Sequence, residues 1–211
     1  MKFHDIASEI RANVVALHQE VVAMAEFLDG REHNFRHATF GYAMACMGQI
    51  DVMSYCTDGP DKARGAQTRR MQRFMERYID QDKSETHRVA IQLMRHTLMH
   101  TGAFRYPYDE TNEIAYTWQC YFNDSDASKR EHYSLTVENP LYQEHLLEAS
   151  QGRPVAQIKA LNFRLILFAA DVVHAADGWI ADMRADPVGQ DRCESNYPAI
   201  RFQIFNRKPK A

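Results

Sequence analysis

Residues 114–122 read Ile-Ala-Tyr-Thr-Trp-Gln-Cys-Tyr-Phe, and this stretch decides the fold class. Apolar side chains stand at every second position, at Ile114, Tyr116, Trp118, Cys120 and Phe122. Because successive side chains of a strand point to opposite faces of a sheet, the alternation predicts a half-buried strand over about 113–122. Before residue 103 the apolar period is close to that of a helix instead. The sequence therefore predicts both helices and a sheet.

Other segments repeat the alternation and extend the expected sheet. Apolar side chains alternate over about 132–137 and again over about 199–205. A short run at 103–108 is joined to the strand at 113–122 through Asp-Glu-Thr-Asn, which is typical of a turn. These segments predict an antiparallel meander of about four strands.

Helical periodicity dominates the remainder of the chain. Apolar residues recur at steps of three and four over about 5–28 and 154–185, the latter being the clearest. Residues 34–56 are apolar on nearly every face, which predicts a buried central helix. Further helices are expected over about 63–80 and 84–101. A further short helix is expected after Asn139-Pro140. We therefore predict an α+β fold that is mainly α, with an antiparallel helical bundle and a small inserted antiparallel β-sheet.

The predicted organisation is a single domain over 1–211. It comprises a bundle at 5–102 and 154–186 and a β elaboration at 103–138 and 198–206. The composition is that of a globular protein, with 45% hydrophobic and 25% charged residues. With 25 basic and 28 acidic residues the net charge is −3, so the overall charge does not by itself indicate a polyanion binder, and local patches are judged separately.

The four cysteines, Cys46, Cys56, Cys120 and Cys193, form no CxxC pair and are expected to be free thiols in a reducing compartment. We see no signal-peptide pattern and no apolar stretch long enough to span a membrane, so we expect a cytoplasmic protein. A Gly-rich phosphate loop and a GxSxG elbow are also missing from the sequence.

The stretch Met-Arg-His-Thr-Leu-Met-His-Thr-Gly, residues 94–102, is the most informative for chemistry. It brings Arg95, His96 and His100 to the end of one predicted helix. A guanidinium suits phosphate, and an imidazole moves protons near neutral pH. Together they are a minimal set for cleaving a phosphodiester without a metal: a ribose 2′-OH attacks, histidine handles the proton and arginine holds the developing charge. A helix-end histidine and a solvated arginine without any catalytic role give the same pattern.

The segment from Arg95 to His100 resembles the Arg-x(4–6)-His motif of the HEPN superfamily, including a polar residue, His96, directly after the arginine. The resemblance implies an all-helical bundle that dimerises so that two motifs face each other. It also implies metal-independent endoribonuclease activity, with Arg95 and His100 as catalytic residues, often in toxin–antitoxin or RNA-processing systems. Other members of the superfamily have lost catalysis and serve as binding or scaffold domains. From the resemblance we expect a homodimer, an RNA substrate, an antitoxin partner and no cofactor.

A basic segment precedes this motif. Between Lys62 and Arg77 six basic residues face one acid, Glu76. The residues expected to contact an RNA backbone are Arg69, Arg70, Arg73 and Arg77, most of them on one helix face. A solvated helix face is the alternative interpretation of the same pattern.

Asp51 lies in the most apolar predicted helix, where an unpaired carboxylate is costly. A buried partner is therefore expected, and Arg95 and His96 are the candidates across the bundle. Asp51 would then either orient the catalytic side chain or form an internal polar tie with no part in the chemistry.

Two other classes of function remain open from the sequence. The pairs His33/His37 and His96/His100 are spaced i, i+4, as in metal-binding helical bundles, but neither has a recognised third ligand, so we expect no metal. The other class is a non-catalytic module that binds nucleotide or protein between the sheet and the bundle. Aromatic residues that would line such a pocket include Phe104, Tyr106, Tyr108, Tyr116, Trp118, Tyr121 and Tyr133.

Overall fold

The structure is a computed structural model, and it describes residues 1–28, 36–60, 63, 65–97, 107–122, 133–138 and 152–201. Within these ranges the side chains of 36–38, 95–97, 121 and 201 are not described. The helices are α1 (Phe3–Phe27), α2 (Arg36–Asp58), α3 (Ala66–Tyr78), α4 (Ser84–Ala90), the π-helix η2 (Ile91–Thr97), α7 (Leu165–Arg184) and α8 (Pro187–Arg201). The strands are β1 (Tyr108–Asp109), β2 (Ile114–Tyr121), β3 (Tyr133–Glu138) and β4 (Gln157–Arg164). The prediction of a mainly helical chain with a small sheet is confirmed.

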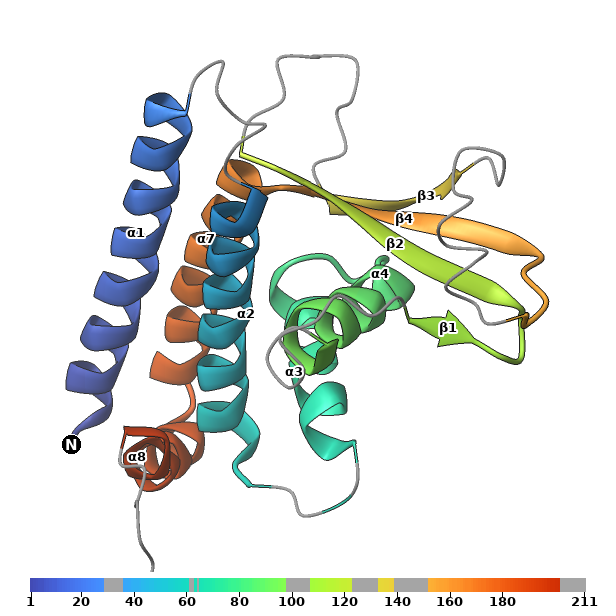
Figure 1. Cartoon of the computed structure of the whole chain (residues 1–211). Helices are drawn as coiled ribbons and strands as arrows, with labels where there is room; N and C mark the ends of the chain where they lie inside the picture. Colours follow the sequence, from blue (N-terminus) through green and yellow to red (C-terminus); the bar gives the residue numbers. More distant parts are fainter. Residues whose placement is uncertain are drawn as a thin grey trace, which may run out of the picture.

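Three long helices, α1, α2 and α7, lie side by side, and α8 packs across one end of them (Figure 1). The sheet lies toward the other end, and α3 and α4 occupy the space between α2 and the sheet. Helix α4 continues directly into η2, so the predicted helix at 84–101 is confirmed over residues 84–97. Gln92 of η2 and Tyr116 of β2 line one pocket, and this pocket marks the region of the candidate site.

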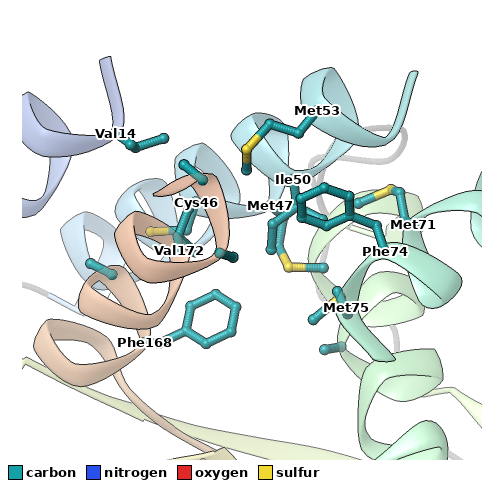
Figure 2. Packing of buried hydrophobic residues seen from close by; sticks show 14 of the residues in the cluster. Val14, Cys46, Met47, Ile50, Met53, Met71, Phe74, Met75, Phe168 and Val172 are labelled. Atoms are coloured by element: carbon teal, nitrogen blue, oxygen red, sulfur yellow. The ribbon is translucent and has the colours of Figure 1, made fainter. Parts of the chain in front are cut away.

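The main core forms where α1, α2, α3 and α7 meet. Figure 2 shows Val14 of α1, Met47 and Ile50 of α2, Phe74 of α3 and Phe168 of α7 pointing into this space. All five are buried. All five lie in segments that the sequence predicted as helices, and burial of apolar side chains from each helix stabilises this arrangement.

The sheet is mixed, and the prediction of an antiparallel meander is wrong in this respect. The strand order is β1-β2-β4-β3, with β1–β2 and β4–β3 antiparallel but β2–β4 parallel. Strand β3 follows β2 in the chain, yet β4 is inserted between them. A meander requires sequential neighbours to pair, and here the last strand takes the central position instead. The Asp-Glu-Thr-Asn turn between β1 and β2 is confirmed, and the Asp109 carboxylate closes it by accepting from the N–H groups of Thr111 and Asn112.

The helix predicted over 154–185 is wrong in its first part, because residues 157–164 form the central strand β4. Ile158 and Leu161, both completely buried, satisfy a helical repeat and also fit a strand that buries side chains on both faces. Pairing with β2 on one side and β3 on the other satisfies the backbone of β4, and the helix begins only at Leu165. Tertiary pairing therefore overrides the local period.

The strand predicted over 198–206 is also wrong where it is described, because residues 198–201 belong to helix α8. Cys193 and Tyr197 lie one helical turn apart and are both buried, with α8 packed against α2. The expected strand residues 202–206 lie outside the described residues, as do the run at 103–106 and the short helix after Asn139-Pro140. Across the described helices, none is long and apolar enough to cross a membrane.

Candidate functional site

Arg95 and His96 lie on the backbone of η2, a π-helical continuation of α4. Their side chains, and all of His100, are outside the described residues. The convergence of Arg95 and His100 therefore stays a prediction. π-Helical turns within α-helices are rare and occur frequently at functional sites, because the inserted residue changes which side chains share a face.

The α4–η2 helix is buried along most of its circumference. Ala90, Ile91, Leu93 and Met94 are all almost completely buried in the main core. Exposed positions recur at Arg88 and Gln92, four residues apart, which leaves one narrow polar stripe on the helix. This stripe faces the sheet and leads toward the backbone of Arg95.

A pocket of about 160 Å³ lies between this stripe and the strands β1 and β2. Its lining residues are Arg88, Val89, Gln92, Pro107, Tyr108, Asp109 and Tyr116. The volume is below the several hundred Å³ of pockets that enclose a whole small-molecule ligand, so it suits one chemical group rather than a complete nucleotide.

Arg88 is the cation that lines this pocket. One of its terminal nitrogens lies 3.4 Å from the Tyr116 hydroxyl and 3.8 Å from the Asp109 carboxylate. Both separations are longer than the usual 2.7–2.9 Å of a charge-assisted hydrogen bond. The side chain is 49% exposed. The guanidinium therefore keeps donors available for an additional acceptor.

A polar network beside the pocket ties α4 to the sheet. Lys159 of β4 donates to both oxygens of Glu85, at 2.9 and 3.0 Å, and the Tyr116 hydroxyl donates to one of them at 3.0 Å. Partial burial opposes ionisation of Glu85, but the hydrogen bonds from Lys159 and Tyr116 outweigh it and lower the pKa of the carboxyl group. Burial and the bond to Glu85 together raise the pKa of Tyr116 to about 12. At neutral pH this network holds an ionised carboxylate and a neutral phenol.

The Asp51 carboxylate accepts from Arg70 and Gln67 of α3, each at 2.8 Å. The expected partners Arg95 and His96 are the residues whose side chains are not described. Arg70 also donates to the Ser54 hydroxyl and the Gly59 carbonyl, and its guanidinium lies 4.9 Å from the centre of the Tyr55 ring. Asp51 is thus part of an internal polar tie between α2 and α3.

Arg70 is consequently not available for the RNA contact that the sequence predicted. Only 4% of the residue is exposed, and Asp51, Ser54 and Gly59 occupy its donors. A guanidinium held in this way is not accessible to a phosphate. The sequence predicted Arg70 at the edge of the basic face, whereas in the structure its side chain lies on the buried side of α3.

The rest of the predicted basic stripe is exposed on α3 but largely paired. Arg73 lies 2.6 Å from the Asp58 carboxylate, and Arg77 lies 2.6 Å from that of Asp182. Arg69 is exposed as well. Aspartates from α2 and α7 therefore offset much of the charge that the sequence of α3 alone suggests, so an RNA path along this face has less support than the sequence implied.

His87 is a buried polar residue that the sequence did not single out. The ring is completely buried, with Nε2 2.6 Å from the Asp80 carbonyl and Nδ1 3.0 Å from the Tyr133 hydroxyl. The carbonyl can only accept, so Nε2 donates and Nδ1 accepts from Tyr133. The ring also stacks on that of Tyr133, which anchors α4 to β3.

The free energy of unfolding is expected to decrease as the pH falls below about 6.5, the usual pKa of histidine. Burial lowers the pKa of His87, and this effect exceeds the opposing effects of the bond to the Asp80 carbonyl and of the nearby Glu76 and Asp80 carboxylates. The folded protein keeps the ring neutral while the unfolded chain binds a proton, so the free energy of unfolding decreases with falling pH, by at most about 1.4 kcal/mol per pH unit. Urea denaturation at pH 7.5, 6.5 and 5.5 measures the effect. A His87→Gln variant should lose this pH dependence, whereas His174→Gln, at an exposed position of α7, should keep it.

No family model matches the chain, and neither a curated protein nor a solved structure shows significant similarity to it. The assignment of function therefore depends on the residues and their arrangement alone.

The sequence reasoning did not identify Arg88, Glu85 or Lys159 as members of a site. Glu85 and Arg88 are spaced i, i+3, a common surface pattern on helices. Lys159 lies in the segment that was predicted as helix, so its position beside Tyr116 across two parallel strands was not foreseeable. Tyr108 and Tyr116, in contrast, were among the aromatic residues expected to line a pocket, and both do so.

Proposed function

We propose that this chain is a metal-independent endoribonuclease similar to HEPN domains and that it acts as a homodimer. Arg95 stabilises the phosphate, His100 transfers the proton and His96 supports them. The observation that carries the proposal is the location of Arg95 and His96 on a π-helical segment that begins beside a pocket containing an open guanidinium, that of Arg88. In this proposal Asp51 has the structural role of holding Arg70 in place.

The reaction needs no water and no metal for its first step. The ribose 2′-OH attacks phosphorus and loses its proton to a base, the bond from phosphorus to the 5′-oxygen breaks, and that oxygen receives a proton. The products are a 2′,3′-cyclic phosphate and a 5′-hydroxyl. Two copies of the motif at a two-fold axis supply one base, one acid and two guanidinium groups around a single phosphate.

Cleavage of single-stranded RNA in the presence of EDTA tests this proposal. Wild-type protein should leave 2′,3′-cyclic phosphate ends, and His100→Ala should reduce the rate by about 10²–10⁴-fold, the range for loss of a general acid or base. Arg95→Ala should have a similar effect on the rate. The matched control is His174→Ala, at an exposed position of α7 away from the pocket, which should cleave like the wild type.

Two results would contradict the nuclease proposal: a protein that stays monomeric at the concentrations used, or His100→Ala and His174→Ala variants that cleave equally. Sedimentation velocity gives the first result, and product analysis by mass spectrometry gives the second. Cleavage at a rate that neither His100→Ala nor Arg95→Ala changes would indicate a contaminating ribonuclease.

A non-catalytic binding module is the second candidate function. The observation that favours it is the pocket itself, in which Tyr108, Tyr116 and Arg88 combine aromatic walls with an open cation. Under this alternative the protein binds an RNA strand without cleaving it, and His100→Ala binds as tightly as the wild type.

A further inference from the structure

Four exposed arginines of the described helices, Arg11, Arg73, Arg77 and Arg88, differ in the distance to the carboxylate that each of them faces. Arg11, Arg73 and Arg77 each lie 2.6–2.7 Å from an aspartate, which is a full charge-assisted hydrogen bond. Within the described part of the chain, Arg88 has the 3.4 and 3.8 Å contacts to Tyr116 and Asp109. Its guanidinium is therefore the one among these four that has capacity for a close acceptor.

The two carboxylates near Arg88 are already engaged. Asp109 accepts from the N–H groups of Thr111 and Asn112 and from the Asn112 side-chain amide, and these bonds lower the pKa of its carboxyl group. Glu85 is held by Lys159 at 2.9 and 3.0 Å. Because the carboxylates bind partners of their own, the pocket offers an incoming group the free donors of Arg88.

The charge and volume of the pocket define the class of that group. Arg88 and Asp109 are the charged residues that line the pocket, and the nearby Asp109 carboxylate repels a dianion more strongly than a group with one negative charge. A cavity of about 160 Å³ holds one such group. The internucleotide phosphodiester of a nucleic-acid backbone has a single negative charge and two acceptor oxygens that suit a guanidinium fork.

The helix also sets the distance of this pocket from the proposed catalytic residues. Arg88 and Arg95 lie on one continuous helix, and a rise of at most about 1.5 Å per residue separates them by no more than about 10 Å along its axis. At about 3.4 Å per nucleotide of a stacked strand, that distance corresponds to about three nucleotides. One RNA strand can therefore reach both positions.

We infer that the pocket at Arg88 is a phosphate subsite that binds a backbone phosphodiester of the RNA within about three nucleotides of the cleaved bond. The inference rests on the proposed function, since it is the nuclease proposal that places the cleaved bond at Arg95. Arg88 acts in binding and not in the chemical step, because the cleaved phosphate lies further along the helix.

The test separates binding from cleavage by using a single-stranded DNA oligonucleotide with the sequence of a cleaved RNA. This probe lacks the 2′-OH and cannot react. Arg88→Gln should raise its dissociation constant about five- to tenfold and reduce the salt dependence of log K by about 0.7, the value for one phosphate contact with a single strand. On RNA the same variant should raise KM with kcat within about twofold, as expected when binding is lost without a change in the transition state.

Arg11→Gln is the matched control, because Arg11 is similarly exposed but is paired with Asp177 at 2.7 Å, between α1 and α7. It should change the affinity for the DNA probe by less than twofold. Both variants should unfold at the midpoint of the wild type, since both substitutions are at exposed side chains. Equal affinities and salt slopes for wild type and Arg88→Gln, or a wild type that does not bind the probe, would overturn the subsite.

The outcomes also distinguish the subsite from the nuclease proposal. Probe binding that depends on Arg88, in a protein that does not cleave RNA, supports the subsite and removes the catalytic proposal. If cleavage depends on His100 but Arg88→Gln has the probe affinity and the KM of the wild type, the nuclease proposal is supported and the subsite proposal is rejected.

Discussion

Replacing Asp51 with alanine is expected to lower the free energy of unfolding by about 3 kcal/mol, because the substitution leaves a buried guanidinium without its counter-ion. The side chain of Arg70 is 5% exposed and that of Asp51 is 24% exposed. Ser54 and Gly59 still accept from Arg70 in the variant, but the nitrogen that bonds Asp51 loses its acceptor and the charge remains. Urea denaturation at neutral pH measures the difference.

Asp58→Ala is the control for this prediction, because it breaks the ion pair with Arg73 on the surface of the same two helices. Exposed pairs contribute little, so the expected loss is below about 1 kcal/mol. A double variant, Asp51→Leu with Arg70→Met, should recover much of the stability, since it removes both charges from the interior. Equal losses for Asp51→Ala and Asp58→Ala would show that the tie between α2 and α3 is not energetically important.

Trp179→Ala is expected to cost about 4 kcal/mol, the middle of the range for removing a large aromatic side chain from a core. Trp179 of α7 is completely buried and its ring packs edge-on against that of Phe3 in α1, at 6.0 Å between centroids. Its indole N–H donates to the Thr57 hydroxyl of α2 at 2.9 Å. One side chain therefore joins three helices, and its loss leaves a cavity at their junction.

Thermal unfolding gives a direct measurement of this effect. A loss of about 4 kcal/mol corresponds to a decrease in Tm of about 8–16 °C for a chain of this size. Trp179→Phe keeps most of the volume and should cost only about 1–2 kcal/mol, mainly through the hydrogen bond to Thr57. Leu167→Ala, at a position of the same helix that is 43% exposed, should change stability by about 0.5 kcal/mol or less.

The helical part of the fold was largely predictable because its signal is local. Val14 and Phe74 occupy core positions that the helical spacing of apolar residues had indicated for α1 and α3. Ile50 lies in the almost uniformly apolar segment that was predicted as a buried helix, α2. Strand β2 was equally predictable, since the alternation from Ile114 to Cys120 has no competing helical interpretation. In each case the pattern of apolar residues in one segment sufficed to identify it.

The candidate site was predictable only in part. The sequence indicated the segment that contains Arg95, and the structure places this segment on η2 beside a pocket. It did not indicate Arg88, whose relevance depends on how far its partners Asp109 and Tyr116 lie from it. Nor did it distinguish Arg70 from Arg73, two arginines on one helix that differ completely in burial.

The sequence by itself determined which segments bury one face, and hence the helices α1 to α4 and the strand β2, because amphipathic spacing is a property of the segment alone. Only the tertiary structure decided that residues 157–164 form a strand and that β2 and β4 run parallel. Those residues fit either period, and the hydrogen bonds that select the strand come from partners elsewhere in the chain. The same holds for the charges. Whether an arginine is buried, paired or open to a ligand depends on which carboxylates the packed elements bring within about 3 Å of it, a distance set by the assembled fold.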